Sequence, residues 1–398
     1  MPVMVWIYGG GLMEGYPTEM EFDGERIARR DVILVSVNYR LNVFGFLTHS
    51  EIIKESPDGF KANWGYLDQK AGIDWVRRNI ANFGGDPGNI TIFGQSAGGG
   101  SVLAHLNSPM ADGSFSKAII QSGGGIDVNG PSFKLMPFLD LEALAQQGED
   151  FFKFVGVKNL AEARKVDAKT LMAKHLAFNK YWNSTIDGKY VVEDASVSIL
   201  AGHQHKIPLM TGATTDESPY GPQDDDIDAW AKVAIPGIAE EYCALAREKA
   251  AKEGISLKEA ATVHFFELSA KLVCDTVARQ GKQTIYNYAF GPEIPGDDAG
   301  VFHSADLWFE FETLAKCWRP FTGKHYDLAR HMCNYWTNFA RSGNPNGNDA
   351  DGTPMPTWTP YTLASPRAMN FFDKPAMEQQ QDKMKALLIE YNRRLLQG

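Results

Sequence analysis

The residues with the clearest chemical meaning form the pattern G-x-S-x-G at 94–98, with Ser96 at its centre. An apolar run over 90–93 precedes this pattern and predicts a buried strand, and a helix-compatible run follows over about 97–106. This order favours a strand-to-helix turn so sharp that only glycines fit beside the serine. Such a turn holds the hydroxyl outward, where helix N–H groups also point. The sequence therefore predicts that Ser96 is a nucleophile.

A serine hydroxyl is a poor nucleophile at neutral pH, so it needs a base, an orienting acid and donors for the developing oxyanion. Gly9, Gly10 and Gly11 follow an apolar run, where small residues let backbone N–H groups approach a ligand oxygen. A dinucleotide-binding loop would require G-x-G-x-x-G, and Glu14 occupies the place of its last glycine. A plain glycine turn is the other alternative. We expect this run to supply the oxyanion donors.

Two neighbouring acids follow a predicted strand at 207–212. Either Asp216 or Glu217 could orient a catalytic base, and either could instead cap the helix that follows. The residues of this segment alone leave both possibilities open.

Nine histidines are candidates for the base. His303 follows a loop rich in glycine and proline, downstream of a predicted strand at 284–290. A catalytic histidine in folds of this type lies on a loop after a late strand, which gives the chain order Ser96, Glu217, His303 for nucleophile, acid and base. His105 lies inside the helix after the serine, and we expect it to pack or to form hydrogen bonds.

No cofactor or metal is expected. His203 and His205 stand two residues apart without a third ligand nearby, which is too few for a typical metal site. The four cysteines are spread without metal-type spacing. They are predicted to be free thiols, with a disulfide pair left open: Cys243, Cys274, Cys317 and Cys333.

The elements that would position these groups alternate along the chain. Strands are predicted over 3–8, 31–38, 90–93, 118–121, 207–212 and 284–290, and helices over 26–30, 66–80 and 97–106. The strand at 31–38 is apolar on both faces, which is typical of a central strand in a parallel sheet. The alternation predicts an α/β fold, with a mostly parallel sheet and helices on both faces.

The rest of the chain is expected to elaborate this sheet within a single catalytic domain over 1–398. The other predicted segments are a mostly loop region over 40–62, helical cap insertions over about 131–205 and 222–280, and amphipathic helices over 321–341 and 377–396.

Composition narrows the partners of the chain. Its 398 residues are 44% hydrophobic, enough for a large core, and its formal charge of −10 without a basic cluster argues against nucleic acid. No apolar run approaches the roughly 18 residues of a membrane helix. The N-terminal residues lack the basic region and apolar core of a signal peptide, which favours a cytoplasmic location. A small-molecule substrate is the expected partner, and the oligomeric state is left open.

These motifs resemble the type-B carboxylesterase family, the cholinesterase-like branch of the α/β-hydrolases. The similarity extends from residue 3 to about residue 345. Five stretches carry it: W-I-Y-G-G-G at 6–11, V-N-Y-R with F-G-F-L over 37–47, N-W-G-Y-L-D-Q at 63–69, F-G-G-D-P through the serine motif over 83–98, and F-H-S-A-D at 302–306. The resemblance implies an α/β-hydrolase fold and a serine carboxylic-ester hydrolase that acts through an acyl-enzyme on small or aryl/acyl esters.

The resemblance also assigns roles to individual residues. It implies Ser96 as the nucleophile, Glu217 as the acid and His303 as the base of a catalytic triad. The backbone N–H groups expected to form the oxyanion hole are those of Gly10, Gly11 and Ala97. Two further residues, Arg40 and Asp68, would form a buried ion pair that braces the scaffold, and Ser122 would support the site without reacting.

Three departures from the family pattern carry expectations of their own. Leu12 replaces the aromatic residue that usually follows the glycines, which should widen the acyl side of the pocket. Ser218 replaces a glycine after the acid, which keeps Asp216 as a fallback candidate. The family also carries early strands ahead of the position of Met1, so we expect those N-terminal strands to be missing and the strand at 31–38 to form an exposed, apolar sheet edge.

Other functions share this fold. Cholinesterase-like folds also serve as non-catalytic binding modules, although these usually lose the serine or the histidine, whereas this chain retains both. A lipase or a feruloyl-type esterase is the alternative within the enzyme class. Aromatic residues that could line the substrate pocket, or simply pack in the core, are Phe44, Phe46, Trp64, Tyr220, Trp308 and Phe309.

Overall fold

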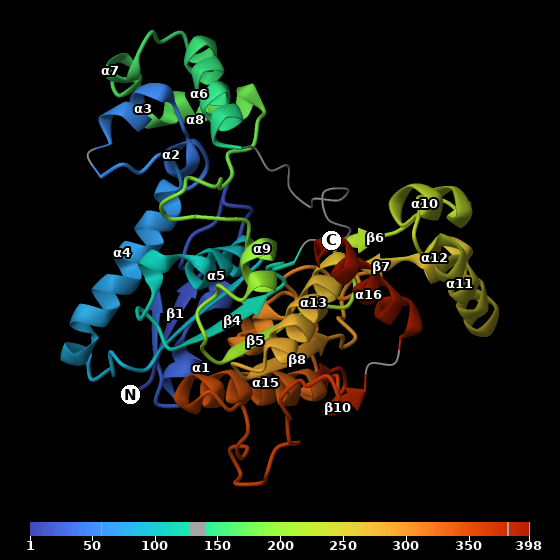
Figure 1. The fold of residues 1–398 in the computed structure, drawn as a ribbon. Coiled ribbons are helices and arrows are strands. Elements are labelled where there is room, and N and C mark those ends of the chain that lie inside the picture. Colours follow the sequence, from blue (N-terminus) through green and yellow to red (C-terminus); the bar gives the residue numbers. More distant parts are fainter. Residues whose placement is uncertain (57, 127–139, 380–381, 398) are drawn as a thin grey trace.

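The computed structural model describes residues 1–56, 58–126, 140–379 and 382–397. Its centre is an eight-stranded sheet with the order β10-β9-β8-β5-β4-β3-β1-β2 (Figure 1). Neighbouring strands are parallel except for the antiparallel pair β9–β10. The strands are β1 (Val3–Ile7), β2 (Ile33–Ser36), β3 (Ile90–Gln95), β4 (Lys117–Gln121), β5 (Leu209–Thr214), β8 (Ile285–Phe290), β9 (Arg367–Phe371) and β10 (Pro375–Gln379).

Helices cover both faces of this sheet, which confirms the predicted fold class (Figure 1). No helix within the described ranges is long and apolar enough to span a lipid bilayer. The α-helices are α1 (Glu25–Ala28), α2 (Asn42–Phe46), α3 (Ser50–Glu55), α4 (Trp64–Asn79), α5 (Ala97–Asn107), α6 (Leu141–Val155), α7 (Leu160–Ala163), α8 (Ala168–Phe178), α9 (Ala195–Ala201), α10 (Ile227–Ala234), α11 (Ala239–Glu253), α12 (Leu257–Ala261), α13 (Phe265–Gln280), α14 (Leu307–Glu310), α15 (Gly323–Ser342) and α16 (Lys383–Gln397).

The strand register places the predicted functional loops at one edge of the sheet. β1 pairs with β3 from Val3↔Ile90 to Ile7↔Gly94, so the glycine run and the serine turn leave neighbouring strands at the same level. β5 pairs with β8 as far as Thr214↔Phe290, so the segments that follow these two strands also start side by side. The carboxyl ends of parallel strands are the usual place for a site in an open α/β sheet.

Two groups of helices lie apart from the sheet. α6, α7 and α8 gather with α3 at one end of the molecule, and α10, α11 and α12 form a second group at another (Figure 1). A two-stranded antiparallel ladder, β6 (Pro219–Tyr220) with β7 (Val263–His264), closes the base of the second group. The chain thus leaves the sheet region at β6, builds α10–α12, and returns through β7.

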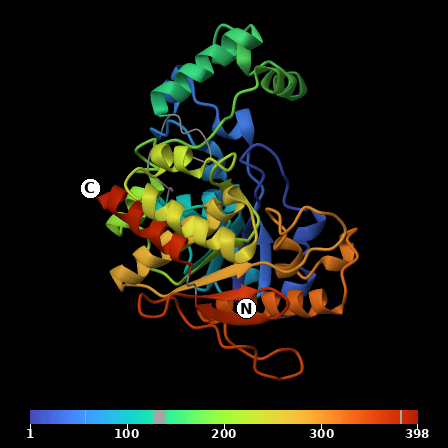
Figure 2. The ribbon, with the colours of Figure 1, turned by 90° about the vertical axis from the view of Figure 1, so that its right-hand side faces the viewer.

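Several predicted boundaries are wrong. Residues 40–62, expected to be mostly loop, contain α2 and α3. Both helices have only five or six residues, too short to show a helical period in the sequence. α13, placed within the second predicted insertion, packs directly on β5 and β8. α16 lies beside α11 and α13, as the red helix next to the yellow helices in Figure 2.

The predicted helix over 377–396 begins instead as a strand. β9 and β10 form an antiparallel hairpin, and β10 is the outermost strand of the sheet. Pro375 is the first residue of β10, a position where a strand tolerates proline because an edge strand leaves N–H groups unpaired. Because proline is rare inside strands, its presence argues against a strand when the sequence is read alone. The helix starts only at Lys383.

β2 lies at the opposite edge of the sheet. Although its apolar composition is typical of a central strand, it pairs only with β1 among the described strands. All four of its residues, Ile33–Ser36, are half-buried, whereas every residue of β1 and β3 is buried. The prediction of an apolar edge at this strand is therefore confirmed.

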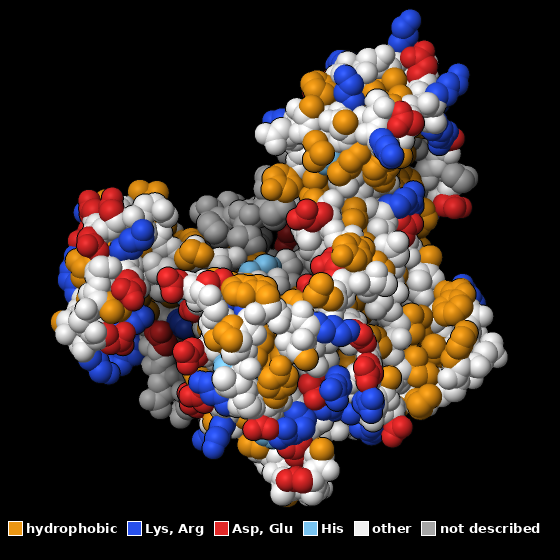
Figure 3. Space-filling view, turned by 180° about the vertical axis from the view of Figure 1, so that it is seen from behind, with side chains coloured by type: hydrophobic (Ala, Val, Ile, Leu, Met, Phe, Trp, Pro, Cys, Tyr) orange, Lys and Arg blue, Asp and Glu red, His pale blue; other side chains and the backbone are white. Residues whose placement is uncertain are grey.

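Charged side chains of both signs are mixed over the face shown in Figure 3. The same view shows the end of the molecule that carries α6–α8 rising above the rest of the structure.

Candidate active site

Ser96 occupies a strained turn between β3 and α5. Its backbone has φ 57° and ψ −127°, a conformation that residues other than glycine rarely adopt. A Cβ atom on Gly98 would lie 2.0 Å from the carbonyl oxygen of Ile7, and one on Gly94 would lie 2.6 Å from the carbonyl carbon of Gly98. Only glycines therefore fit on either side of the serine, because α5 starts hard against β1. This geometry explains the spacing of the G-x-S-x-G pattern.

The structure brings Glu217 and His303 together. The imidazole Nδ1 of His303 contacts Oε2 of Glu217 as a hydrogen bond and ion pair. The buried carboxylate is also fixed through Oε1, which accepts hydrogen bonds from Ser122 Oγ at 2.6 Å and from the backbone N–H of Thr214 at 2.9 Å. A carboxylate can only accept, so Nδ1 carries a proton and Nε2 is left as the basic nitrogen of a neutral ring.

The surroundings of His303 set its affinity for a proton. Burial of the imidazole lowers its pKa, but the hydrogen bond and the negative charge of Glu217 outweigh burial, and Asp306 adds to their effect. The net result is a pKa raised above the ordinary histidine value. Phe266 stacks on the ring, with 5.3 Å between centroids and 15° between planes, and so fixes its orientation.

Ser96 and His303 line the same pocket, which has a volume of about 410 Å³. Within the described residues no hydrogen bond joins Ser96 Oγ to the imidazole. The amide nitrogen of Gln95 lies 3.4 Å from His303 Nε2. Catalytic hydrogen bonds are often long in an unliganded site and tighten when substrate binds. The absence of this hydrogen bond among the described residues therefore leaves the shared pocket as the observation that relates Ser96 to His303.

The glycine run lies beside this serine. Gly10 and Gly11 both have positive φ, at 94° and 65°, and a Cβ on Gly10 would meet the carbonyl oxygen of Glu14 at 2.2 Å. In the described part of the chain no acceptor occupies the backbone N–H of Gly10, Gly11 or Ala97. Gly11 and Ala97 line the pocket next to Ser96, whereas Gly10 is not among the lining residues.

The neighbouring acid, Asp216, has a different contact. Its Oδ2 accepts a hydrogen bond from the backbone N–H of Val301 at 2.8 Å, which ties it to the loop before His303. Ser218, which stands where the family pattern has a glycine, has φ 46°. This is the left-handed conformation that a glycine would adopt without strain. Leu12 likewise has a positive φ, of 62°, and lines the pocket.

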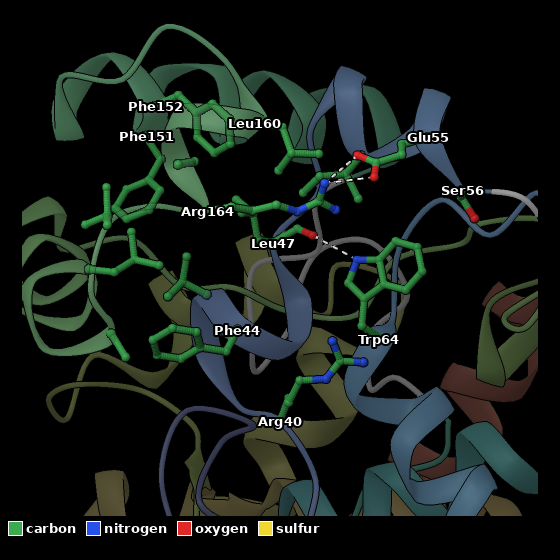
Figure 4. Close-up of a pocket in the computed structure, with 16 residues that line it drawn as sticks. Arg40, Phe44, Leu47, Glu55, Ser56, Trp64, Phe151, Phe152, Leu160 and Arg164 are labelled. Carbon is green, nitrogen blue, oxygen red and sulfur yellow. Dashed lines mark hydrogen bonds and ion pairs between the residues drawn. The ribbon is translucent and has the colours of Figure 1, made fainter.

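The Arg40–Asp68 ion pair forms but is not buried. Arg40 Nε and Nη2 donate to the two carboxylate oxygens at 2.7 and 2.8 Å. The arginine side chain is 54% exposed, so the prediction of a buried pair is wrong. Arg40 lines a pocket between α2–α4 and α6–α8 instead of packing in the core, so its side chain stays open to solvent (Figure 4).

The other histidines have structural contacts. His105 is buried, and its two ring nitrogens hydrogen-bond to the hydroxyl of Tyr190 and to Gln69. Burial lowers its pKa to about 3, which keeps the ring neutral. His203 pairs with Glu193, and His205 bonds the carbonyl of Ser108. Within the described residues no group of His, Cys, Asp and Glu side chains could hold a metal ion, and the four cysteines are unpaired.

The aromatic residues proposed from the sequence do not line the catalytic pocket. Phe44 and Trp64 line a separate pocket of about 520 Å³ between α2–α4 and α6–α8, where Trp64 Nε1 donates to the carbonyl of Leu47 at 3.1 Å (Figure 4). The aromatic residues of the catalytic pocket are Tyr66, Tyr190, Phe265 and Phe266.

Sequence reasoning also missed residues that touch the candidate base. These residues are Phe266 and Gln95, which both contact His303. Gln95 could have been noticed as a polar residue inside the serine motif. Phe266 could not, because only the fold brings the start of α13 beside a loop near residue 303.

The sheet order and the strained serine turn after β3 define an α/β-hydrolase fold, and His303, which bonds Glu217, lines the same pocket as Ser96. Comparison with known proteins agrees. The sequence profile of the "Carboxylesterase family" matches residues 1–229 and 223–388. The chain belongs to the carboxylesterase family.

Individual relatives give the extent of the similarity. A para-nitrobenzyl esterase of Bacillus subtilis is 30% identical over 397 residues, covering 96% of this chain and 79% of that protein. An acylcarnitine hydrolase of Mus musculus is 30% identical over 405 residues, covering 90% of this chain and 66% of that protein. A solved structure of a PNB esterase superposes with a TM-score of 0.75 at 28% identity, covering 98% of this chain and 81% of the other. The chain thus spans about two thirds of the length of the mouse relative. Membership of this family supports ester hydrolysis.

Proposed function

We propose that this protein is a serine carboxylic-ester hydrolase in which Ser96, His303 and Glu217 act as nucleophile, base and orienting acid. The observation that carries the proposal is the fixed Glu217–His303 pair, which leaves a basic Nε2 in the pocket that contains the strained serine. Two groups besides the imidazole hold the carboxylate, Ser122 Oγ and the backbone N–H of Thr214, so the imidazole is oriented before substrate arrives. Such preorganisation is what general-base activation of a serine needs.

The reaction would follow a two-step acyl-enzyme route. His303 Nε2 takes the proton of Ser96 as Oγ attacks the ester carbonyl, and then gives that proton to the leaving alcohol. Glu217 stabilises the imidazolium formed in between. Water then attacks the acyl-enzyme, with His303 again as the base, and the acid product leaves Ser96 free.

The negative charge that develops on the carbonyl oxygen needs donors. The backbone N–H groups of Gly11 and Ala97, which lack acceptors and lie in the pocket lining, are suited to this role, and Gly10 would complete the set. Each such donor contributes roughly 10²–10³ in turnover in well-studied serine hydrolases. A pocket of about 410 Å³ with aromatic and aliphatic walls suits small or aryl/acyl esters.

The test is covalent labelling of the folded protein with a fluorophosphonate, together with hydrolysis of p-nitrophenyl acetate. We expect a single adduct on Ser96, and a loss on the order of 10⁶ in turnover for Ser96→Ala. Ser342→Ala, at an exposed serine of α15, is the matched control and should label and turn over normally. Hydrolysis that persists in Ser96→Ala, or an adduct on another residue, would show that the assignment is wrong. Absence of any adduct would favour a non-catalytic binding module.

A further inference from the structure

The catalytic pocket extends along one face of α5, well beyond Ser96. With a rise of 1.5 Å per residue, the last helical residue in its lining lies about 16 Å along the helix axis from the serine. The true reach is a few ångströms less, because helical side chains lean toward the N-terminus. The lining residues from α5 recur with the i, i+3, i+4 and i+7 spacing of one helix face: Ala97, Gly100, Leu103, Ala104 and Asn107.

The facing wall comes from the segment 183–196. This wall is mixed: Ile186, Val191 and Val192 line the pocket together with polar residues of the same segment. Leu103 adds an aliphatic side chain from α5. These aliphatic side chains suit a hydrocarbon portion of a substrate.

The end of the pocket away from Ser96 is polar. The side-chain amide of Asn107 is enclosed there, and both its Nδ2 and its Oδ1 are buried without a hydrogen-bond partner in the described structure. A buried amide with neither group paired is costly, so it calls for a polar partner that binds in the pocket. No other part of the site described above uses this residue.

Charge at this end narrows the class of partner. The backbone N–H of His205 donates to the carbonyl of Leu106 at 3.0 Å, which brings the segment 203–205 to the end of α5. There His203 Nδ1 bonds Glu193, a residue of the pocket lining, at 2.7 Å. Asp194, also in the lining, is occupied by the backbone of α9, which it caps. The described lining contains no lysine or arginine, so a negatively charged group would be repelled.

We propose that one half of the ester, acyl or alcohol, lies along α5 and that Asn107 recognises the group at its far end. This group is neutral and forms hydrogen bonds, as a primary amide or a hydroxyl does. This inference rests on the proposed function, with Ser96 as the attacking residue. An amide partner can both donate to Oδ1 and accept from Nδ2, and so satisfies the two unpaired atoms together. With bonds of about 1.5 Å, an extended chain needs on the order of ten to twelve bonds to span the pocket.

The experiment compares kcat/KM of the wild-type protein for esters that differ only in their end group. One arm uses p-nitrophenyl esters whose acyl chains end in a carbamoyl or a methyl group, over a series of lengths. The second arm places the same end groups on the alcohol half of acetate esters, and so shows which half lies along α5. We expect a preference of about tenfold or more for the carbamoyl end in one arm, confined to the longer chains, as one or two neutral hydrogen bonds would give.

The variant Asn107→Leu should reverse this preference, because the pocket end becomes apolar. Asn348→Leu makes the same change at an exposed asparagine outside the pocket lining, and should keep the wild-type ratio. A wild-type preference for the methyl end at every length in both arms would overturn the inference, and this comparison needs no variant to fold. So would an unchanged ratio in Asn107→Leu. Failure of the proposed function looks different, since p-nitrophenyl acetate would then be hydrolysed equally by Ser96→Ala.

Discussion

Replacing the charged partner of His303 tests the electrostatic reasoning about the site. In the wild type, burial lowers the pKa of His303 and Glu217 raises it, with a net rise above 6.5. The neutral imidazole is the active form, so activity is present above this pKa and is lost as the pH falls through it. Glu217→Gln removes the charge and leaves the burial, so we expect the acid limb of the kcat/KM profile to move to lower pH.

The size of the shift follows from the contact. A unit charge about 4 Å away at an effective dielectric constant of about 20 contributes about 4 kcal/mol, which is about three pKa units at most. We therefore expect a shift of at least about one unit, accompanied by a fall of roughly 10³–10⁴ in kcat because the amide can hold the wrong tautomer. The assay is hydrolysis of p-nitrophenyl acetate between pH 5 and 9.

Asp216→Asn is the matched control. This neighbouring carboxylate accepts from Val301 N–H and does not contact the imidazole, and an asparagine oxygen can keep that hydrogen bond. Its acid limb should stay at the wild-type position. A limb that moves upward in Glu217→Gln, or one that moves only in Asp216→Asn, would refute the assignment of the acid.

Two further predictions concern groups that hold the site. Ser122→Ala removes the 2.6 Å hydrogen bond to the buried Glu217 carboxylate, so we expect the free energy of unfolding to fall by about 1.5–3 kcal/mol, measured by urea denaturation, together with a lower kcat. Ser122→Ala leaves the backbone at the same φ of 43° and adds no atoms, so an unchanged free energy of unfolding in this variant would argue against the hydrogen bond as a stabilising contact. Gly98→Ala places a methyl group 2.0 Å from the Ile7 carbonyl, so we expect severe destabilisation, above about 3 kcal/mol, and loss of fluorophosphonate labelling. Gly98 has no positive φ, so its substitution tests the clash alone, whereas Gly113→Ala tests backbone strain alone, because φ there is 66° and an added Cβ meets nothing within 4 Å. A Gly98→Ala protein as stable as Gly113→Ala would contradict the argument.

Much of the fold could be predicted because the parallel strands are continuous apolar runs. β1, β3, β4, β5 and β8 are buried on both faces, and each was expected within a few residues of its observed bounds. The hairpin β9–β10 was missed, because its edge strand needs fewer apolar residues and opens with a proline. The short helices α2 and α3 were missed because one or two turns show no period.

The candidate site divides in a similar way. The serine turn was predictable, since steric crowding at Gly94 and Gly98 leaves a pattern in the chain itself. The residues alone could not decide between Asp216 and Glu217 as the partner of His303. That choice depends on the direction in which each side chain points from the turn after β5. Contacts such as Phe266 on His303 join segments distant in sequence, and the residue types alone carry no trace of them. The expectation of a buried Arg40–Asp68 pair failed because exposure depends on how segments distant in sequence, here α2–α4 and α6–α8, leave a pocket beside Arg40.

The ladder β6–β7 links the outlying helices α10–α12 to the candidate active site. His264 Nδ1 hydrogen-bonds the backbone carbonyl of Glu217 at 3.0 Å, and the N–H of Phe265 donates to the carbonyl of Ser218 at the same distance. The next residue, Phe266, supports the imidazole. Glu217 and Phe266, which both contact His303, thus lie on the two segments that lead into and out of the insertion α10–α12. For protein engineering, this means that α10–α12 can be exchanged for another module only if 217–220 and 263–266 are kept as a unit.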